Sequence, residues 1–237
     1  MKLLISVIDP LECTAFSRWP DYLDVKNPSD GSLGKPRPGV IRAVREFIGG
    51  RIVISAAIGD ASDDAELYSK RAVMAAGEGA DIIKVGLFSF SSRRAVVKFL
   101  QKIGDSLKDS GGQKKIVPAV YADVADKNLI RKFPRLAREA GAWGCLIDTF
   151  DKSRGSLSAH LDLDALRRFT ASCRENGVVS ALAGGLRMED FDWLSNVNPD
   201  VAGFRSAVVT NGRGEVGIDA RKLEGLYSKV EGGKFKV

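Results

Sequence analysis

Histidine, cysteine and long apolar runs are scarce in this chain of 237 residues. Its only histidine is His160, which argues against metal sites and catalytic triads built on histidine. Cys13, Cys145 and Cys173 are widely spaced and odd in number, so the sequence indicates neither a disulfide framework nor a zinc site. No apolar run approaches the roughly 18 residues of a membrane span, and the N-terminal segment is typical of a first strand rather than a signal peptide. We therefore expect a cytoplasmic, reduced protein with no metal, no cofactor and no membrane partner.

The basic residues give the chain a net charge of +6, which makes nucleic acid the first partner to consider. They occur, however, as scattered pairs such as Arg93-Arg94 and Arg167-Arg168, inside helical patterns with acidic residues nearby. This arrangement is typical of solvated helix faces, whereas a nucleic-acid-binding protein would present one continuous basic face. We predict no nucleic-acid partner and keep such binding as a remote alternative. A mild attraction for anionic metabolites is consistent with the charge.

Short apolar or β-branched runs alternate with amphipathic stretches along the chain, at intervals of about 30 residues. The predicted strands cover residues 3–8, 22–27, 52–60, 81–88, 115–123, 144–150, 177–185 and 201–209. The predicted helices cover residues 40–48, 64–78, 91–108, 127–140, 160–176, 188–196 and 220–230. A helix over 11–19 has the weakest pattern.

Eight strands that alternate with helices imply parallel pairing through right-handed crossovers, and about 250 residues is the usual size of a closed (β/α)8 barrel. The alternative is an open doubly wound sheet, which normally carries a glycine-rich nucleotide loop after its first strand. Here the first strand is followed by Asp9-Pro10-Leu11-Glu12. We therefore predict a single α/β domain, a (β/α)8 TIM barrel over residues 1–237, which is compatible with a homo-oligomer.

Charged residues interrupt predicted strands that should be almost wholly apolar. Six of them lie at or just beyond the carboxyl end of a strand: Asp24, Lys26, Lys84, Asp123, Asp148 and Lys152. An unpaired charge inside a barrel costs several kcal/mol. Charged residues are therefore tolerated there only where they pair with one another or with an anionic ligand. The active sites of such barrels lie at this end. A single lysine here could be part of an ordinary structural salt bridge, but the whole set predicts a shared catalytic mouth.

Glycine and arginine mark the last two strands. Gly184 and Gly185 end the seventh, and Arg205 and Ser206 lie within the eighth. In these barrels the loops after strands seven and eight commonly bind phosphate, because glycine lets backbone N–H groups approach the anion. We predict that these four residues bind a substrate phosphate. Two alternatives stay open: the glycines serve only tight turns, and Arg205 belongs to a structural ion pair.

Lysines and carboxylates without histidine or metal suit carbonyl chemistry on a phosphorylated small molecule. A neutral lysine attacks a carbonyl to form a Schiff base, whose iminium withdraws electrons from the adjacent carbon. Burial and a second cation would lower the pKa of Lys26, while Asp24 beside it would raise that pKa. The residues alone leave this balance open. The same mouth also suits a triose- or pentose-phosphate isomerase, epimerase or simple aldolase whose lysines act only electrostatically.

Specific sequence blocks occur along nearly the whole chain: DVKNP at 24–28, GSLG at 31–34, SAAIGD at 55–60, KVGL at 84–87, YAD at 121–123, LIDT at 146–149 and ALAG at 181–184. This set resembles the (5-formylfuran-3-yl)methyl phosphate synthases, also called 4-(hydroxymethyl)-2-furancarboxaldehyde-phosphate synthases. The resemblance implies a (β/α)8 barrel and a lyase that condenses two glyceraldehyde 3-phosphate molecules into a furan aldehyde phosphate. Phosphate and two waters are lost, and the product serves methanofuran-type cofactors of one-carbon metabolism.

The resemblance also implies roles for individual residues. Lys26 matches the lysine that forms the Schiff base, and Lys84 matches the lysine that acts as proton acceptor. Asp24, Asp148 and Lys152 match further active-site positions. The chain departs from the family pattern at positions 185 and 206, where it has glycine and serine instead of serine and glycine.

Overall fold

The strands of the barrel are parallel and pair in sequence order until β8 closes on β1. This computed structural model describes residues 1–90, 92–210 and 214–234, and the counts that follow refer to those ranges. The eight strands are β1 (Lys2–Val7), β2 (Tyr22–Val25), β3 (Val53–Ala61), β4 (Ile82–Leu87), β5 (Lys115–Tyr121), β6 (Gly144–Asp148), β7 (Val179–Leu182) and β8 (Val201–Phe204). The prediction of a (β/α)8 barrel is confirmed.

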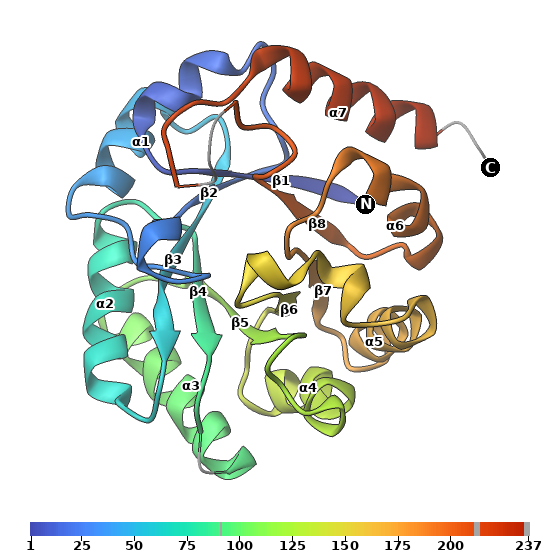
Figure 1. Ribbon diagram of the computed structural model, residues 1–237. Helices are drawn as coiled ribbons and strands as arrows, with labels where there is room; N and C mark the ends of the chain where they lie inside the picture. Colours follow the sequence, from blue (N-terminus) through green and yellow to red (C-terminus); the bar gives the residue numbers. More distant parts are fainter. Residues whose placement is uncertain (91, 211–213, 235–237) are drawn as a thin grey trace.

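Seven α-helices lie around the outside of this barrel in the described ranges (Figure 1). They are α1 (Val40–Ile48), α2 (Ala65–Gly77), α3 (Arg93–Asp109), α4 (Lys127–Glu139), α5 (Leu163–Glu175), α6 (Phe191–Val197) and α7 (Ala220–Lys234). No helix in the described part of the chain combines the length and the apolar character that a membrane span requires.

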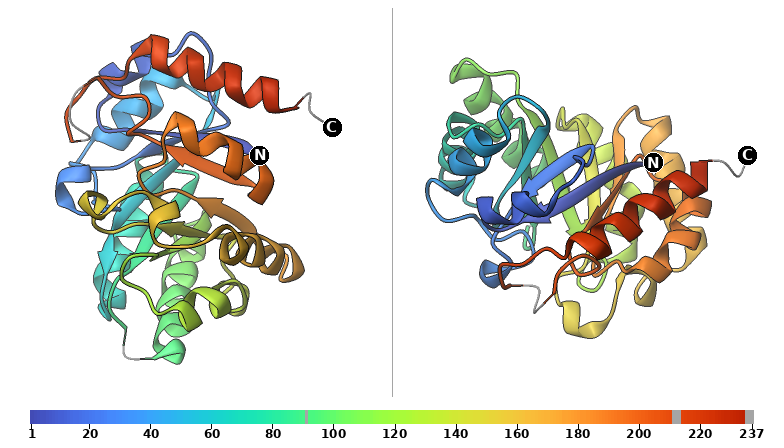
Figure 2. Two further views of the ribbon diagram at one scale, coloured as in Figure 1. Left: turned by 45° about the vertical axis from the view of Figure 1, so that its right-hand side comes forward. Right: turned by 90° about the horizontal axis from the view of Figure 1, so that it is seen from above.

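The first crossover has no α-helix, and the predicted helix over 11–19 is wrong. A 3₁₀ helix, η1 (Pro10–Ala15), stands there, with Pro10 in its first turn and the Asp9 carboxylate accepting the Leu11 N–H at 2.9 Å. The α7 helix lies beside this segment, red against blue in Figures 1 and 2. There the Tyr227 hydroxyl donates to the Arg18 carbonyl oxygen at 2.8 Å.

The last two strands end well before the residues that the sequence predicts, by three and five residues, whereas the other strand ends differ by at most two. The β7 strand stops at Leu182 rather than at 185, because Gly184 and Gly185 adopt positive φ angles of 111° and 63° and turn the chain away. The β8 strand stops at Phe204 rather than at 209. These early ends place residues 184–186 and 205–206 in the loops at the mouth of the barrel. The predicted start of the third helix at 91 lies outside the described residues.

The barrel interior is filled by a cluster of its own, separate from the larger layer between strands and helices. Its buried members are Tyr22, Leu33, Ala57, Ile82, Val117, Ala119, Leu146 and Val201. Leu33 does not belong to a strand: it enters from the loop between β2 and α1 and is fully buried. This side chain therefore closes part of the mouth.

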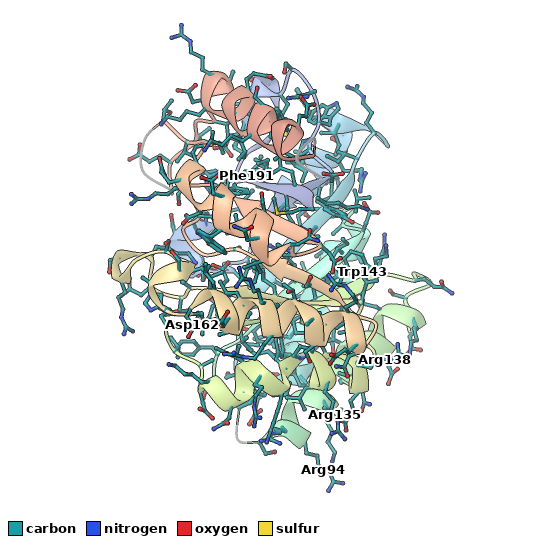
Figure 3. The ribbon with its side chains drawn as sticks, turned by 90° about the vertical axis from the view of Figure 1, so that its right-hand side faces the viewer. Arg94, Arg135, Arg138, Trp143, Asp162 and Phe191 are labelled. Carbon is teal, nitrogen blue, oxygen red and sulfur yellow. The ribbon has the colours of Figure 1, made fainter. Side chains whose placement is uncertain are left out.

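Three aspartates at the amino end of the barrel precede strands and accept backbone N–H groups from a neighbouring strand. The bonds join Leu3 N to Asp21, Ile54 N to Asp81 and Ser180 N to Asp200, at 2.8–2.9 Å. Because they pair N–H groups at the strand starts, they help to set the register of the sheet. Trp143, just before β6, lies at this end, and Asp162, just before α5, lies at the opposite side of the molecule (Figure 3).

Candidate active site

A cavity at the mouth of the barrel extends into its interior. Eight of the residues predicted from sequence line it: Lys26, Lys84, Asp148, Lys152, Gly184, Gly185, Arg205 and Ser206. Of the other two, Asp24 lies fully buried against Lys84, and Asp123 is not among the lining residues. The structure therefore brings the predicted lysines together at one cavity.

Asp24 is the fully buried centre of the charged cluster. Its carboxylate accepts hydrogen bonds from the Ser6 and Ser55 hydroxyls at 2.9 and 2.7 Å and pairs with the Lys84 Nζ at 2.8 Å. Burial alone would raise the pKa of Asp24, but the charges of Lys84 and Lys26 and the hydrogen bonds outweigh it. The pKa therefore lies below the ordinary value, and the group stays a carboxylate at neutral pH.

The sheet register explains why these side chains meet. Asp24 on β2 stands beside Ser55 on β3, and Lys84 on β4 stands beside Ala57 on β3. The small β3 side chains leave room for Lys84 to reach Asp24 across the strand between them. Lys26 follows directly after β2, and its side chain also enters the cavity. Both amines are buried, with Lys26 6% and Lys84 5% exposed.

A second ion pair stands across the mouth. The Lys152 ammonium donates to the Asp148 carboxylate and to the Thr149 carbonyl oxygen, and lies 3.2 Å from the Ser32 hydroxyl. Asp148 also accepts the Thr149 N–H at 2.7 Å. Asp148 ends β6, and Lys152 begins the 3₁₀ helix η3 (Lys152–Arg154), so a four-residue spacing suffices to pair them. The pair presents an ammonium and a carboxylate to the same cavity.

Asp60 is a half-buried carboxylate at the mouth that the sequence argument missed. Strict alternation from Ser55 and Ala57 would turn Asp60 out of the barrel. Instead β3 contains a bulge between Ala57 and Asp60, with Gly59 at a φ of 116°, and this extra residue reverses the alternation. Burial raises the pKa of Asp60, although hydrogen bonds from Tyr121 and from two backbone N–H groups partly offset the effect.

Tyr121 donates its hydroxyl to the Asp60 carboxylate. Burial and the nearby Asp60 charge raise the pKa of this phenol well above its ordinary value, so it keeps its proton at neutral pH. Gly86 of the KVGL block is adjacent, and a Cβ there would collide with the Tyr121 oxygen. Glycine is therefore required at this point of β4, because the Tyr121–Asp60 contact takes the space of a side chain.

The loops after β7 and β8 form the opposite wall. A Cβ at Gly184 would come within 2.9 Å of the Thr149 nitrogen, so this glycine is needed for the turn as well as being placed at the cavity. Gly185 and Ser206 also line the cavity. Their predicted contacts with a phosphate stay a prediction.

Arg205 is held in a structural ion pair, the second of the two possibilities that its sequence position left open. Its terminal nitrogens donate to both carboxylate oxygens of Glu12 at 3.0 Å, to the Ser6 carbonyl oxygen at 3.0 Å and to the Glu215 carbonyl oxygen at 2.8 Å. The arginine thus ties β8 to the first crossover. Glu12 was not predicted, since the helical pattern expected there did not indicate that its side chain turns inward.

Asp123 anchors a loop and is not among the residues that line the cavity, so its predicted contact with substrate stays a prediction. Its carboxylate accepts the backbone N–H groups of Phe150 and Asp151 at 2.7 and 2.8 Å. These residues begin the loop that carries Lys152. The aspartate that follows β5 therefore has a structural role, because it binds the backbone just after β6.

The sequence model of the 4-HFC-P synthase family matches residues 3–227. This chain belongs to the 4-HFC-P synthase family. It is 39% identical over 211 residues to the (5-formylfuran-3-yl)methyl phosphate synthase of Methanosarcina barkeri, covering 88% of this chain and 90% of that relative. It is 39% identical over 234 residues to the synthase of the same name from Methanosarcina acetivorans, covering 98% and 100%. The family relatives are synthases by name, which supports an enzyme.

Solved structures of low sequence identity share the barrel of this 4-HFC-P synthase family member. A crystal structure of 3-hexulose-6-phosphate synthase has a TM-score of 0.68 at 17% identity and covers 97% of this chain and 99% of its own. At this identity the likeness concerns the fold alone. The family resemblance predicted from the sequence blocks is therefore confirmed by the sequence relatives and not by these structures.

Proposed function

We propose that this protein condenses two molecules of glyceraldehyde 3-phosphate to 4-(hydroxymethyl)-2-furancarboxaldehyde phosphate in the biosynthesis of methanofuran-type cofactors. One phosphate and two waters leave, so two three-carbon sugars become one six-carbon monophosphate. The names of the relatives support this reaction. The observation that carries it is the pair of buried lysines, Lys26 and Lys84, that line one cavity and share the Asp24 carboxylate.

Lys26 is the nucleophile in this proposal. Its neutral Nζ attacks the aldehyde carbon of one triose phosphate, a C–N bond forms and water leaves, which gives an iminium. The iminium makes the proton on the adjacent carbon easier to remove. Removal of that proton gives an enamine, whose electron pair expels phosphate from the next carbon. Lys26 is buried and lines the cavity, where its amine can meet the aldehyde.

Lys84 and the Asp148–Lys152 pair handle protons. Asp24 holds Lys84 at 2.8 Å and is itself fixed by two serine hydroxyls, so the amine has a defined position in the cavity wall. In its neutral form Lys84 accepts a proton from the carbon beside the iminium, and as an ammonium it returns a proton to a developing alkoxide. The Asp148–Lys152 pair supplies a second base and a second acid. Aldol addition of the second triose, ring closure with loss of two waters, and hydrolysis of the iminium, which takes up one water and frees Lys26, complete the product.

The test is product analysis after incubation with glyceraldehyde 3-phosphate. We expect a compound with the strong ultraviolet absorbance of a furan aldehyde and the mass of a C6 monophosphate, formed together with one equivalent of inorganic phosphate. The Lys26→Arg variant is the control, since arginine keeps the charge but is not a usable nucleophile. Formation of isomerised triose phosphates without a furan would contradict the proposal and favour an isomerase or a simple aldolase.

A further inference from the structure

We propose that Asp60, Tyr121 and Ser32 are positioning residues that hold the Lys152 ammonium at its place in the active site. This inference rests on the proposed function and concerns side chains that the lysine chemistry does not itself use. Together they connect the ends of β3 and β5 to the loop after β6, across the mouth of the barrel.

The first part of this connection fixes the loop between β2 and α1. The Asp60 carboxylate accepts the backbone N–H groups of Ser32 at 3.0 Å and Leu33 at 3.3 Å, and the Tyr121 hydroxyl. Leu33 is fully buried in the interior cluster directly behind this contact. A backbone that is bound at two consecutive N–H groups and anchored by a buried leucine has little freedom to move.

The second part joins this loop to Lys152. The Ser32 hydroxyl, on a side chain that is nearly fully buried, donates its proton to the Thr149 carbonyl oxygen at 2.8 Å. Its oxygen therefore keeps its lone pairs for other donors, and the Lys152 Nζ lies 3.2 Å away. Lys152 also donates to Asp148 and Thr149. An ammonium has three N–H donors, so these three acceptors define its direction.

The same loop begins at the proposed Schiff-base lysine. Asn27, the residue after Lys26, donates its backbone N–H to the Gly34 carbonyl oxygen at 2.9 Å and so closes the loop at its base. The contact with Asp60 is made within this closed segment. The Asp60 carboxylate therefore orders both the segment that follows Lys26 and the Ser32 hydroxyl that contacts Lys152. In this way it keeps the Lys26 and Lys152 amines at a fixed distance from each other.

The experiment compares Ser32→Ala, Ser32→Thr and Tyr121→Phe with two matched controls. Ser180→Ala removes a buried serine hydroxyl that binds Asp200 at the amino end, and Tyr227→Phe removes a phenol that binds Arg18 beside α7. The first readout is the rate at which acetic anhydride labels Lys152, measured by peptide mass spectrometry relative to exposed lysines. The second is the separate measurement of kcat and KM for furan formation from glyceraldehyde 3-phosphate.

We expect Ser32→Ala and Tyr121→Phe to label Lys152 about fivefold faster and to lower kcat about fivefold, with KM within about twofold. Ser32→Ala loses the bonds of the hydroxyl to Thr149 and Lys152, and Tyr121→Phe loses the bond to Asp60. Ser32→Thr keeps the hydroxyl, so its Lys152 labelling rate and its kcat should lie close to the wild-type values. The two controls should leave Lys152 labelling and kcat unchanged even where their melting temperatures fall.

Wild-type labelling of Lys152 in both Ser32→Ala and Tyr121→Phe would overturn the inference, as would equal effects in the controls. If Ser32→Ala does not fold, Tyr121→Phe decides, because it acts on the loop from the side of Asp60. Labelling does not depend on turnover. A wild-type protein that makes no furan would therefore refute the proposed function, while the labelling rates would still decide the positioning role.

Discussion

The two ends of the barrel use the same acidic residue in different ways. At the amino end, Asp21, Asp81 and Asp200 accept backbone N–H groups of neighbouring strands. At the mouth, Asp24 and Asp148 pair with lysine ammonium groups beside a cavity. Aspartates of the first kind satisfy the backbone and fix strand register, whereas those of the second kind compensate buried charges that the fold itself does not need.

Whether a carboxylate binds backbone N–H groups or lysine ammonium groups therefore indicates its role better than its position in the sequence does. Asp123 stands at the mouth, but its carboxylate is bound by two backbone N–H groups, as at the amino end. Arg205 lines the cavity and is nevertheless bound to Glu12. Four predictions test this distinction, and they are given from the largest expected effect to the smallest.

Lys26→Arg should abolish activity, with kcat at least about a thousandfold lower, because the guanidinium cannot form the iminium. The melting temperature should change little, since the charge beside Asp24 is kept. The control is Lys115→Arg at the amino end, where the ammonium lies 4.4 Å from the centre of the Trp143 ring. Steady-state kinetics and thermal melts check both, and a fully active Lys26→Arg would contradict the iminium route.

Asp24→Asn should destabilise the protein by about 3–5 kcal/mol, because the buried Lys84 ammonium loses its counter-charge. Its activity per folded molecule should also fall. Asp200→Asn should cost about 1–2 kcal/mol through weakened, partly buried hydrogen bonds to Ser180 and leave activity per folded molecule unchanged. Urea denaturation gives the stabilities. If Asp24→Asn and Asp200→Asn lost the same share of activity per folded molecule, the proposed difference in role between aspartates at the two ends of the barrel would be contradicted.

The pH dependence of stability should report Asp24 directly. Its pKa is lowered in the folded state, so its contribution is present above the unfolded-state pKa of about 3.9 and is lost as the pH falls through the lower folded-state value. The difference in unfolding free energy between wild type and Asp24→Asn should therefore be largest near pH 6 and shrink below about pH 4. The exposed Asp164→Asn serves as control. A difference that grows on acidification would contradict the ion-paired carboxylate.

Asp123→Asn should resemble the amino-end variants, with a loss of about 1–2 kcal/mol and kcat/KM within about threefold of wild type. Its carboxylate holds backbone N–H groups and does not line the cavity. The measurement is kcat/KM together with a urea melt. A KM raised more than about tenfold would instead support the prediction from sequence that Asp123 contacts the substrate.

The barrel and its charged mouth could be predicted because they depend on alternation and on strand order. Period-two alternation put Asp24 and Lys26 on one face, and parallel strands brought Lys84 and Asp148 to the same end. Asp60 could not be found in this way, since a bulge reverses the alternation of β3 before it. Nor could Glu12, whose side chain is drawn inward by an arginine 193 residues away. Both depend on contacts between distant segments that local patterns do not encode.

Trapping of the covalent adduct tests the central claim most directly. The protein is incubated with glyceraldehyde 3-phosphate, reduced with borohydride, digested and examined by mass spectrometry. We predict a substrate-derived mass on the peptide that contains Lys26, located on that residue and absent without substrate. An adduct on a different lysine, or none while furan product accumulates, would contradict the account.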